Sequence, residues 1–205
     1  MRHSGHSWAF HHRAWIGIAC FIPAILAVIL SRPIFPQGSV WDYFFNVIAW
    51  GFFLAYLLFR IWATLFVGGR KDRELQTGGP YSLMRNPLYF GSLCFALSGA
   101  LFLKSPLFLL LICLAAALYV RFVIRTEEAV LENAFGDAFR YYKKSTPRLF
   151  PRLSNFRTPA RIDVDLVAIR REMKRLMLAS WMPLAMDLIM HLRSRPDWPH
   201  YFRLL

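Results

Sequence analysis

The chain has 205 residues, of which 57% are hydrophobic and 17% aromatic, and its mean hydropathy is +0.37. Lys and Arg number 25 against 12 Asp and Glu, which gives a formal net charge of +13. This composition argues against a water-soluble domain, and because the basic clusters flank apolar runs, the positive charge is expected to face anionic lipid headgroups and not nucleic acid.

Four apolar runs predict an all-α integral membrane protein with about four transmembrane helices. They cover residues 14–30, 44–67, 88–103 and 107–120. Some are shorter than the ~20 residues that cross a hydrocarbon core, so flanking aromatic and basic side chains are expected to complete those spans. The segment "SRPIFPQG" after the first run has no apparent cleavage site, so residues 14–30 are expected to be a retained membrane helix.

The distribution of basic residues predicts the orientation. The N-terminal segment, the loop 67–87 and the C-terminal tail are rich in Arg and Lys, whereas the other two connections hold only Arg32 and Lys104. Cytoplasmic loops carry an excess of such residues. Both termini and the central loop are therefore predicted to be cytoplasmic, which four crossings allow.

The C-terminal third is predicted to hold basic, lipid-facing helices. Residues 125–145 predict a helix that leaves the membrane, and the proline-punctuated segment 146–162 is expected to lie near the headgroups. Residues 163–175 predict another helix. The apolar segment 176–192 contains a proline and an aspartate, which favours an interfacial or re-entrant helix over a fifth crossing. We divide the chain into a membrane domain at 1–159 and a basic amphipathic extension at 160–205.

Charged residues at helical spacing mark the end of the fourth apolar run. In "VRFVIRTEEAVLE", residues 120–132, four side chains fall three or four residues apart and share one face: Arg121, Arg125, Glu128 and Glu132. One interpretation is a solvated salt-bridge stripe. Because the stripe begins where the helix emerges from the membrane, a polar ligand site is the alternative, with Glu127 about a hundred degrees round the helix.

A second polar segment, "GGPYSLMRNPLYFG" at residues 78–91, separates the second and third apolar runs. Pro87 is expected to start the third helix with its first amides unsatisfied, an arrangement that attracts an anionic group. Arg85 adds charge, and Tyr81 and Tyr89 add hydroxyl groups. The alternative is an ordinary loop with interfacial tyrosines.

Together, these two segments resemble the C-terminal core of the isoprenylcysteine carboxyl methyltransferase and phospholipid methyltransferase family. The resemblance rests on "GPYSLMRNPLYFG" followed some forty residues later by "RTEEAVLENAFGDAFRYYKKSTPRLFP", and it covers residues 78–151. It implies an integral membrane enzyme that binds S-adenosylmethionine at the cytoplasmic face and takes a lipophilic acceptor from the bilayer.

The resemblance also implies roles for individual residues. Arg85 and Glu128 are the predicted catalytic residues. The predicted cofactor-binding residues are Tyr81, Asn86, Pro87, Tyr89, Gly91, Arg125, Glu127 and Glu128. Many family members have histidine at the position of Asn86 and tyrosine at that of Phe139, so no imidazole is predicted to act here and one hydroxyl is missing. The acceptor atom stays open between an isoprenoid carboxylate, a phospholipid amine headgroup and a thiolate.

Two other functions fit the sequence. An NADPH-dependent membrane reductase of the sterol-reductase type resembles the family in its C-terminal core, and a non-catalytic lipid-binding scaffold would bind no cofactor. Arg60, inside the second run, either reaches the interface or meets an anionic group. The three cysteines, Cys20, Cys94 and Cys113, lack C-x-x-C spacing, so no disulfide is predicted. The four N-terminal histidines are irregularly spaced, so no metal site is predicted at His3, His6, His11 and His12.

Overall fold

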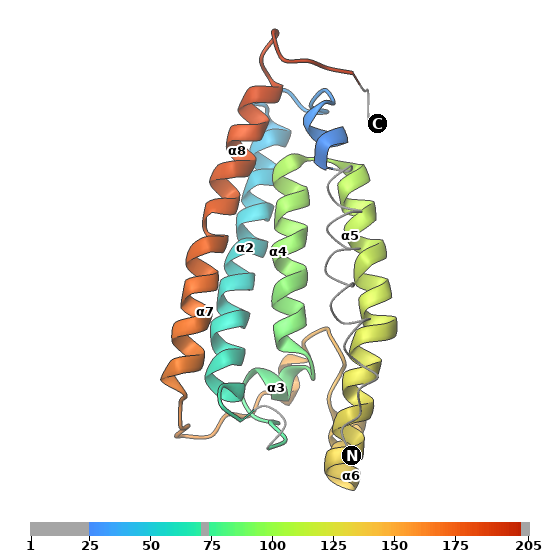
Figure 1. Ribbon diagram of the computed structural model, residues 1–205, viewed down its shortest axis with the longest axis vertical. Helices are drawn as coiled ribbons and strands as arrows, with labels where there is room; N and C mark the ends of the chain where they lie inside the picture. Colours follow the sequence, from blue (N-terminus) through green and yellow to red (C-terminus); the bar gives the residue numbers. More distant parts are fainter. Residues whose placement is uncertain (1–24, 71–73, 202–205) are drawn as a thin grey trace, which may run out of the picture.

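The computed structural model describes residues 25–70 and 74–201, and Figure 1 shows their arrangement as a helical bundle. The helices in chain order are α2 (Val40–Val67), α3 (Pro80–Leu83), α4 (Pro87–Leu103), α5 (Pro106–Leu118), the π-helix η1 (Tyr119–Ile124), α6 (Arg125–Ser145), the short 3-10 helix η2 (Leu153–Asn155), α7 (Leu166–Ala179) and α8 (Trp181–Arg193). Residues 25–29 are also helical. The predicted all-α class is confirmed. Most of the first predicted helix, 14–30, lies outside the described residues.

Two of the described helices are long and apolar enough to cross a membrane, namely α2 and the continuous helix Pro106–Phe135. The apolar helix α4 is shorter, with 17 residues. The outer face of α2 exposes large apolar side chains such as Trp41, Phe44 and Leu54. A soluble protein rarely exposes a patch of this extent, so hydrocarbon is the solvent that these residues suit.

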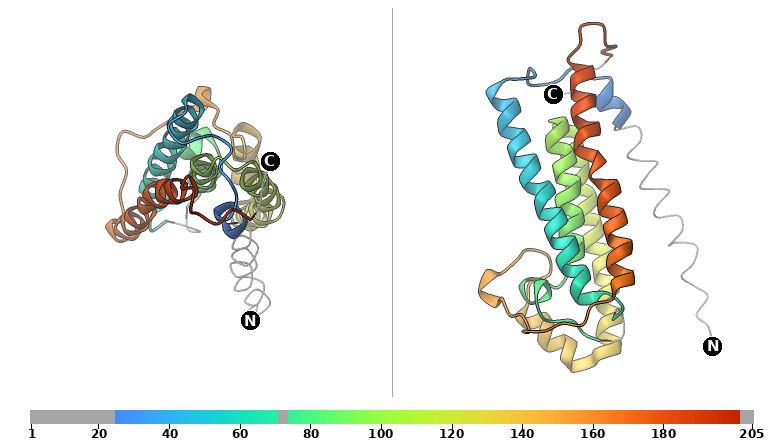
Figure 2. Two further views of the ribbon diagram at one scale, coloured as in Figure 1. Left: turned by 90° about the horizontal axis from the view of Figure 1, so that it is seen from above. Right: turned by 90° about the vertical axis from the view of Figure 1, so that its left-hand side faces the viewer.

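The bundle is built around the pair α2 and α4, with α5 beside α4 and the α7–α8 segment on the other side (Figures 1 and 2). Small residues permit close packing: a side chain at Gly91 would meet the Arg60 side chain of α2 at 3.1 Å. Ser39 accepts a hydrogen bond from the amide of Asp42 and so caps the start of α2. Ser105 caps α5 in the same way.

Buried charges hold the end of the bundle that lies at the top of Figure 1. Lys104 ends α4 in the left-handed conformation, and its ammonium lies 2.8 Å from the carboxylate of Asp42 at the start of α2. Arg193, at the end of α8, donates hydrogen bonds to the carbonyl groups of Ser31 and Leu103. These contacts tie α8 to the C-terminal end of α4, because guanidinium groups satisfy free helix carbonyls.

The position of α8 corrects the expected interfacial or re-entrant placement of residues 176–192. α7 packs on α2 and α8 packs on α4, so the segment runs along the bundle (Figure 2). The distribution of basic residues predicted that the C-terminal tail and the loop 67–87 lie on the same side of the membrane. In the structure, residues 194–201 lie at the opposite end of the bundle from α3, which belongs to that loop (Figure 1). Hydropathy could not predict this packing, because it depends on the tertiary partners of α8. The boundary at residue 159 stays a prediction.

The other end of the bundle is closed by backbone contacts between two distant segments. The amide of Arg85 donates to the carbonyl of Pro147, and the amide of Arg152 donates to that of Leu83. The amide of Gly79 donates to the carbonyl of Arg157 at 2.7 Å. Gly79 has φ +57, and a side chain there would overlap the ring of Phe66. Residues 79–85 of the predicted loop and the proline-rich segment therefore form one layer, which holds the candidate site.

Candidate active site

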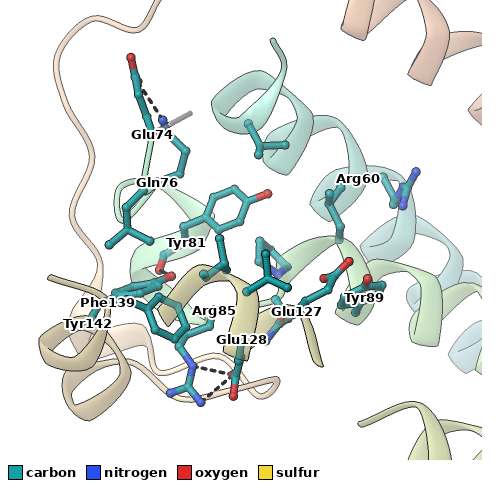
Figure 3. Close-up of a pocket in the computed structure, with 17 residues that line it drawn as sticks. Arg60, Glu74, Gln76, Tyr81, Arg85, Tyr89, Glu127, Glu128, Phe139 and Tyr142 are labelled. Carbon is teal, nitrogen blue, oxygen red and sulfur yellow. Dashed lines mark hydrogen bonds and ion pairs between the residues drawn. The ribbon is translucent and has the colours of Figure 1, made fainter. Parts of the chain in front are cut away.

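A cavity of about 370 Å³ opens at this end of the bundle (Figure 3), and we call it the polar cavity because five charged side chains line it, although apolar groups make up most of its wall. Its volume lies in the range of small-molecule sites, and charged, aromatic and apolar groups share its wall. The lining residues are Arg60, Val67, Glu74, Leu75, Gln76, Tyr81, Arg85, Asn86, Pro87, Leu88, Tyr89, Glu127, Glu128, Val130, Leu131, Phe139 and Tyr142. The structure thus brings the two polar segments of the sequence together across one cavity.

Two arginines neutralise Glu128. Arg85 donates from Nε to Glu128 Oε1 at 2.9 Å, and Arg148 donates from Nη2 to Oε2 at 2.8 Å. The side chain of Glu128 is 5% exposed and that of Arg85 is 8% exposed. Arg85 also donates to the carbonyl groups of Lys143 and Thr146. Both predicted catalytic residues lie at the cavity, and their charges are engaged in this network.

Glu127, the neighbour of Glu128, lies differently. It is only partly buried, and its carboxylate points toward the hydroxyl of Tyr89 across the cavity (Figure 3). Because consecutive residues on a helix project about a hundred degrees apart, one carboxylate of the pair faces the two arginines and the other faces the cavity. Glu127 is therefore the member of the acidic pair that is placed to meet a ligand.

The predicted ladder of four charged residues on one helix face is not what the structure shows. Arg125 is exposed and lines neither of the two cavities described here. Glu128 pairs with Arg85 and Arg148, while Glu132 pairs with Arg140 and Lys143. The π-helix η1 lies within this segment. A π turn holds an extra residue, so it rotates Arg121 out of the register with Arg125, Glu128 and Glu132 that an unbroken α-helix predicts.

The first predicted motif forms the opposite wall. Asn86 donates from its side chain to the carbonyl of Arg148 at 3.0 Å and makes no side-chain cap on α4. Pro87 is the first residue of α4, as expected. Gly91 lies one turn further in and lines neither cavity; it accommodates the side chain of Arg60 instead. Gly91 thus has a packing role here, and its contact with the cofactor stays a prediction.

Tyr81 is held by a tyrosine from the second motif. The hydroxyl of Tyr142 donates to the carbonyl of Tyr81 at 2.6 Å, and both side chains are buried. Burial raises the pKa of each phenol well above its ordinary value. Both groups therefore stay neutral at physiological pH, and the contact positions α3 against α6 at the floor of the cavity.

A second cavity, of about 450 Å³, adjoins the first and is mostly apolar. It lies among α4, α5 and η1 and is lined by Arg60, Tyr89, Ser92, Leu93, Ala96, Ile112, Ala115, Ala116, Tyr119, Val120, Ile124 and Leu149. Arg60 and Tyr89 line both cavities. A polar compartment and an apolar compartment thus meet at these two side chains.

Arg60 joins this site to α7. Its Nε donates to Glu172 Oε1 at 2.6 Å, and the side chain of Glu172 is 5% exposed. The interpretation of Arg60 as a side chain that only reaches the interface is therefore wrong. Its distance in sequence from Glu172 explains why no local pattern could have indicated the pair.

Sequence reasoning missed further residues at this site, among them Tyr119, Tyr142, Arg148 and Glu172. The two tyrosines and Arg148 lie within or next to the quoted motifs, so proximity was a usable signal for them. Glu172 had no such signal. Among the described residues, no group of three or more His, Cys, Asp and Glu side chains is arranged to hold a metal ion. The N-terminal histidines and Cys20 lie outside the described residues, and Cys94 and Cys113 are free thiols.

Comparison with known proteins agrees with this geometry. Residues 45–138 match the family described as phospholipid methyltransferase. This confirms the resemblance inferred from the two motifs. The phospholipid methyltransferase segment runs from α2 into α6, so it contains Arg60, Arg85 and Glu127 but ends before Arg148, α7 and α8.

Curated relatives fall into two groups. The cobalt-zinc-cadmium resistance protein CzcN of Cupriavidus metallidurans is 39% identical over 112 residues, which cover 55% of this chain and 51% of that protein. A protein-S-isoprenylcysteine O-methyltransferase of Schizosaccharomyces pombe is 36% identical over 81 residues, which cover 40% of this chain and 34% of that enzyme. The chain thus spans about half of the first relative and a third of the second. No solved structure matches the chain significantly.

Proposed function

We propose that this protein is a membrane-embedded S-adenosylmethionine-dependent methyltransferase that acts on a lipophilic acceptor. The observation that carries the proposal is the meeting of a polar cavity and an apolar cavity at Arg60 and Tyr89. Methyl transfer needs a donor and a nucleophile aligned in a site that excludes water. Two compartments of different polarity with a shared wall suit a water-soluble donor and a lipid-soluble acceptor.

The residues of the polar cavity fit S-adenosylmethionine. The carboxylate of Glu127 suits a ribose diol or an ammonium group, and the guanidinium of Arg60 suits a carboxylate. The rings of Tyr81, Tyr89 and Phe139 offer aromatic faces to a sulfonium cation. When bound, the cofactor supplies an electrophilic methyl group. The ion pair between Arg85 and Glu128 holds together the two segments that carry these side chains.

The apolar cavity fits the hydrocarbon part of an acceptor. Its lining comes from membrane helices, and Ala96, Ala115 and Ala116 leave room between them. Tyr89 and Tyr119 stack edge to face with ring centroids 5.2 Å apart, and both line this cavity. We propose that the acceptor enters from the bilayer between α4 and α5 and places its nucleophilic atom near Tyr89. A carboxylate or thiolate acceptor needs alignment only, whereas an ammonium must first lose a proton.

The proposed orientation puts the polar cavity at the cytoplasmic face. The layer around it carries the basic loop 67–87 and the basic segment 146–162, as the positive-inside rule requires. Exposed Arg152, Arg157 and Arg161 are then positioned to meet anionic headgroups. The resistance proteins among the relatives are named for metals, but the described residues give no reason to propose a metal site in this chain.

The proposal is tested by titrating the detergent-purified protein with S-adenosylmethionine and, separately, with NADPH in a calorimeter. Saturable binding of S-adenosylmethionine is expected. The protein is then incubated with a membrane lipid extract and the cofactor labelled in its methyl group, and label is expected in the organic phase. Binding of NADPH alone would instead identify a reductase, and binding of neither would leave the lipid-binding scaffold.

A further inference from the structure

We propose that Glu172 is a positioning residue of the active site, which orients Arg60 to receive a carboxylate at the junction of the two cavities. The inference rests on the proposed function for the identity of the ligands. It makes α7, which lies beyond the matched segment 45–138, part of the catalytic apparatus. The family match alone does not predict a contribution from this helix.

The geometry leaves part of Arg60 available. The guanidinium uses Nε for Glu172, at 2.6 Å, and within residues 25–70 and 74–201 this is the one hydrogen bond that the side chain makes. An arginine presents five N–H donors in a fixed plane. Fixing Nε therefore fixes the direction of the two terminal nitrogens. These form the fork that binds a carboxylate through two parallel hydrogen bonds.

The surroundings explain why Arg60 needs such support. Its aliphatic part packs on Gly91, and its side chain is 17% exposed, so it lies well inside the bundle. An isolated charge at this depth is costly, and Glu172 supplies the compensating charge. Arg175 contacts the second oxygen of Glu172 at 3.3 Å, which restrains the carboxylate in turn. The carboxylate of Glu172 is thus held between two guanidinium groups, and the direction of Arg60 is set by a contact within the protein.

The position of Arg60 defines the group that it receives. It lines both the polar and the apolar cavity, so an anion at its fork belongs to whichever ligand reaches the junction. A carboxylate is the shared chemistry, and it comes either from the amino-acid part of the cofactor or from a lipophilic acid in the apolar cavity. The two sources differ in the probe that detects them.

The test compares wild type with Glu172→Gln, which removes the charge and keeps the shape. Calorimetry measures the affinity for S-adenosylmethionine and for its decarboxylated analogue. Competition experiments measure the affinity for palmitate and, separately, for hexadecanol, which lacks the carboxylate. For Glu172→Gln we expect at least about a tenfold loss of affinity for one carboxylate-bearing probe and no change for its carboxylate-free counterpart. A loss for the cofactor identifies the first source, and a loss for palmitate identifies the second.

Two further variants separate positioning from folding. Arg60→Lys retains the ion pair but lacks the fork, so it is expected to keep the thermal midpoint and lose the same probe affinity. Asp187→Asn, which removes an exposed carboxylate from α8, is the matched control and should behave as wild type. If wild type binds the cofactor, and Glu172→Gln and Arg60→Lys bind every probe as tightly as wild type does, the inference is overturned while the proposed function stands. If wild type binds no cofactor, the proposed function fails and the palmitate arm alone decides the role of Arg60.

Discussion

Arg85 and Glu128 lie 2.9 Å apart, Nε to Oε1, and connect the segment before α4 with the first turn of α6. The two residues are 43 positions apart in the sequence, and both side chains are buried. This ion pair therefore assembles the candidate site from its two motifs, and the partner Arg148 adds the proline-rich segment as a third element.

Replacing Glu128 by glutamine should destabilise the protein. The change leaves two arginines facing a neutral side chain, and removal of one partner from a buried ion pair costs about 3–5 kcal/mol. A clear fall in the thermal midpoint of the detergent-purified protein is expected. Asp137→Asn, which breaks an exposed ion pair with Arg140, is the control and should leave the midpoint nearly unchanged. Equal midpoints for both variants would contradict the structural role of Glu128.

Replacing Glu127 by glutamine should weaken cofactor binding without destabilising the fold. Its carboxylate faces the cavity, and a hydrogen bond to a charged group contributes about 1.5–3 kcal/mol, equivalent to roughly a tenfold to hundredfold change in Kd. Calorimetry with S-adenosylmethionine measures the effect, and a melting curve provides the stability control. A variant with the wild-type Kd would remove Glu127 from the proposed cofactor site.

Filling the apolar cavity should affect the acceptor and spare the cofactor. Ala116 lines this cavity, whereas its neighbour Ala117 is exposed on the outer face of α5. Ala116→Phe is expected to raise the KM for the lipid acceptor roughly fivefold to a hundredfold, since overpacking an occupied space costs about 1–3 kcal/mol. Ala117→Phe adds the same ring outside and should retain the wild-type KM. Similar kinetics for the two variants would argue against acceptor binding between α4 and α5.

Removing the hydroxyl of Tyr142 should loosen the floor of the polar cavity. Tyr142→Phe leaves the buried carbonyl of Tyr81 without its donor, at a cost of about 1–3 kcal/mol. The neighbouring Tyr141→Phe is the matched control, because the side chain of Tyr141 is exposed. Urea or thermal unfolding in detergent compares the two, and a larger loss for Tyr141→Phe would contradict this assignment.

The same tyrosine predicts a dependence of stability on alkaline pH. Burial raises the pKa of Tyr142 in the folded protein, whereas the unfolded chain titrates near pH 10. Above about pH 10 the unfolded state loses a proton that the folded state retains, so the contribution of this group to stability falls as pH rises. Tyr142→Phe should therefore lose stability less steeply between pH 10 and 11 than wild type. Parallel curves would contradict a raised pKa for this phenol.

Local sequence patterns determined the class of the protein and the two halves of its site. Long apolar runs bounded by charge, proline and glycine define α2, α4 and α5 because hydrocarbon requires continuous helices of this kind. The motifs around Arg85 and Glu127 carry enough specific side chains in a fixed order to indicate the resemblance to the methyltransferase family, whose model matches residues 45–138.

Only the tertiary structure decided which charge meets which. Glu127 and Glu128 are adjacent in sequence, and the helix register after η1 directs one to the cavity and the other to two arginines. Arg60 and Glu172 are 112 positions apart, and they meet because α7 packs along α2. The physical reason is common to both cases: an ion pair in a membrane bundle depends on helix rotation and packing, and neither property is encoded in the spacing of a single segment.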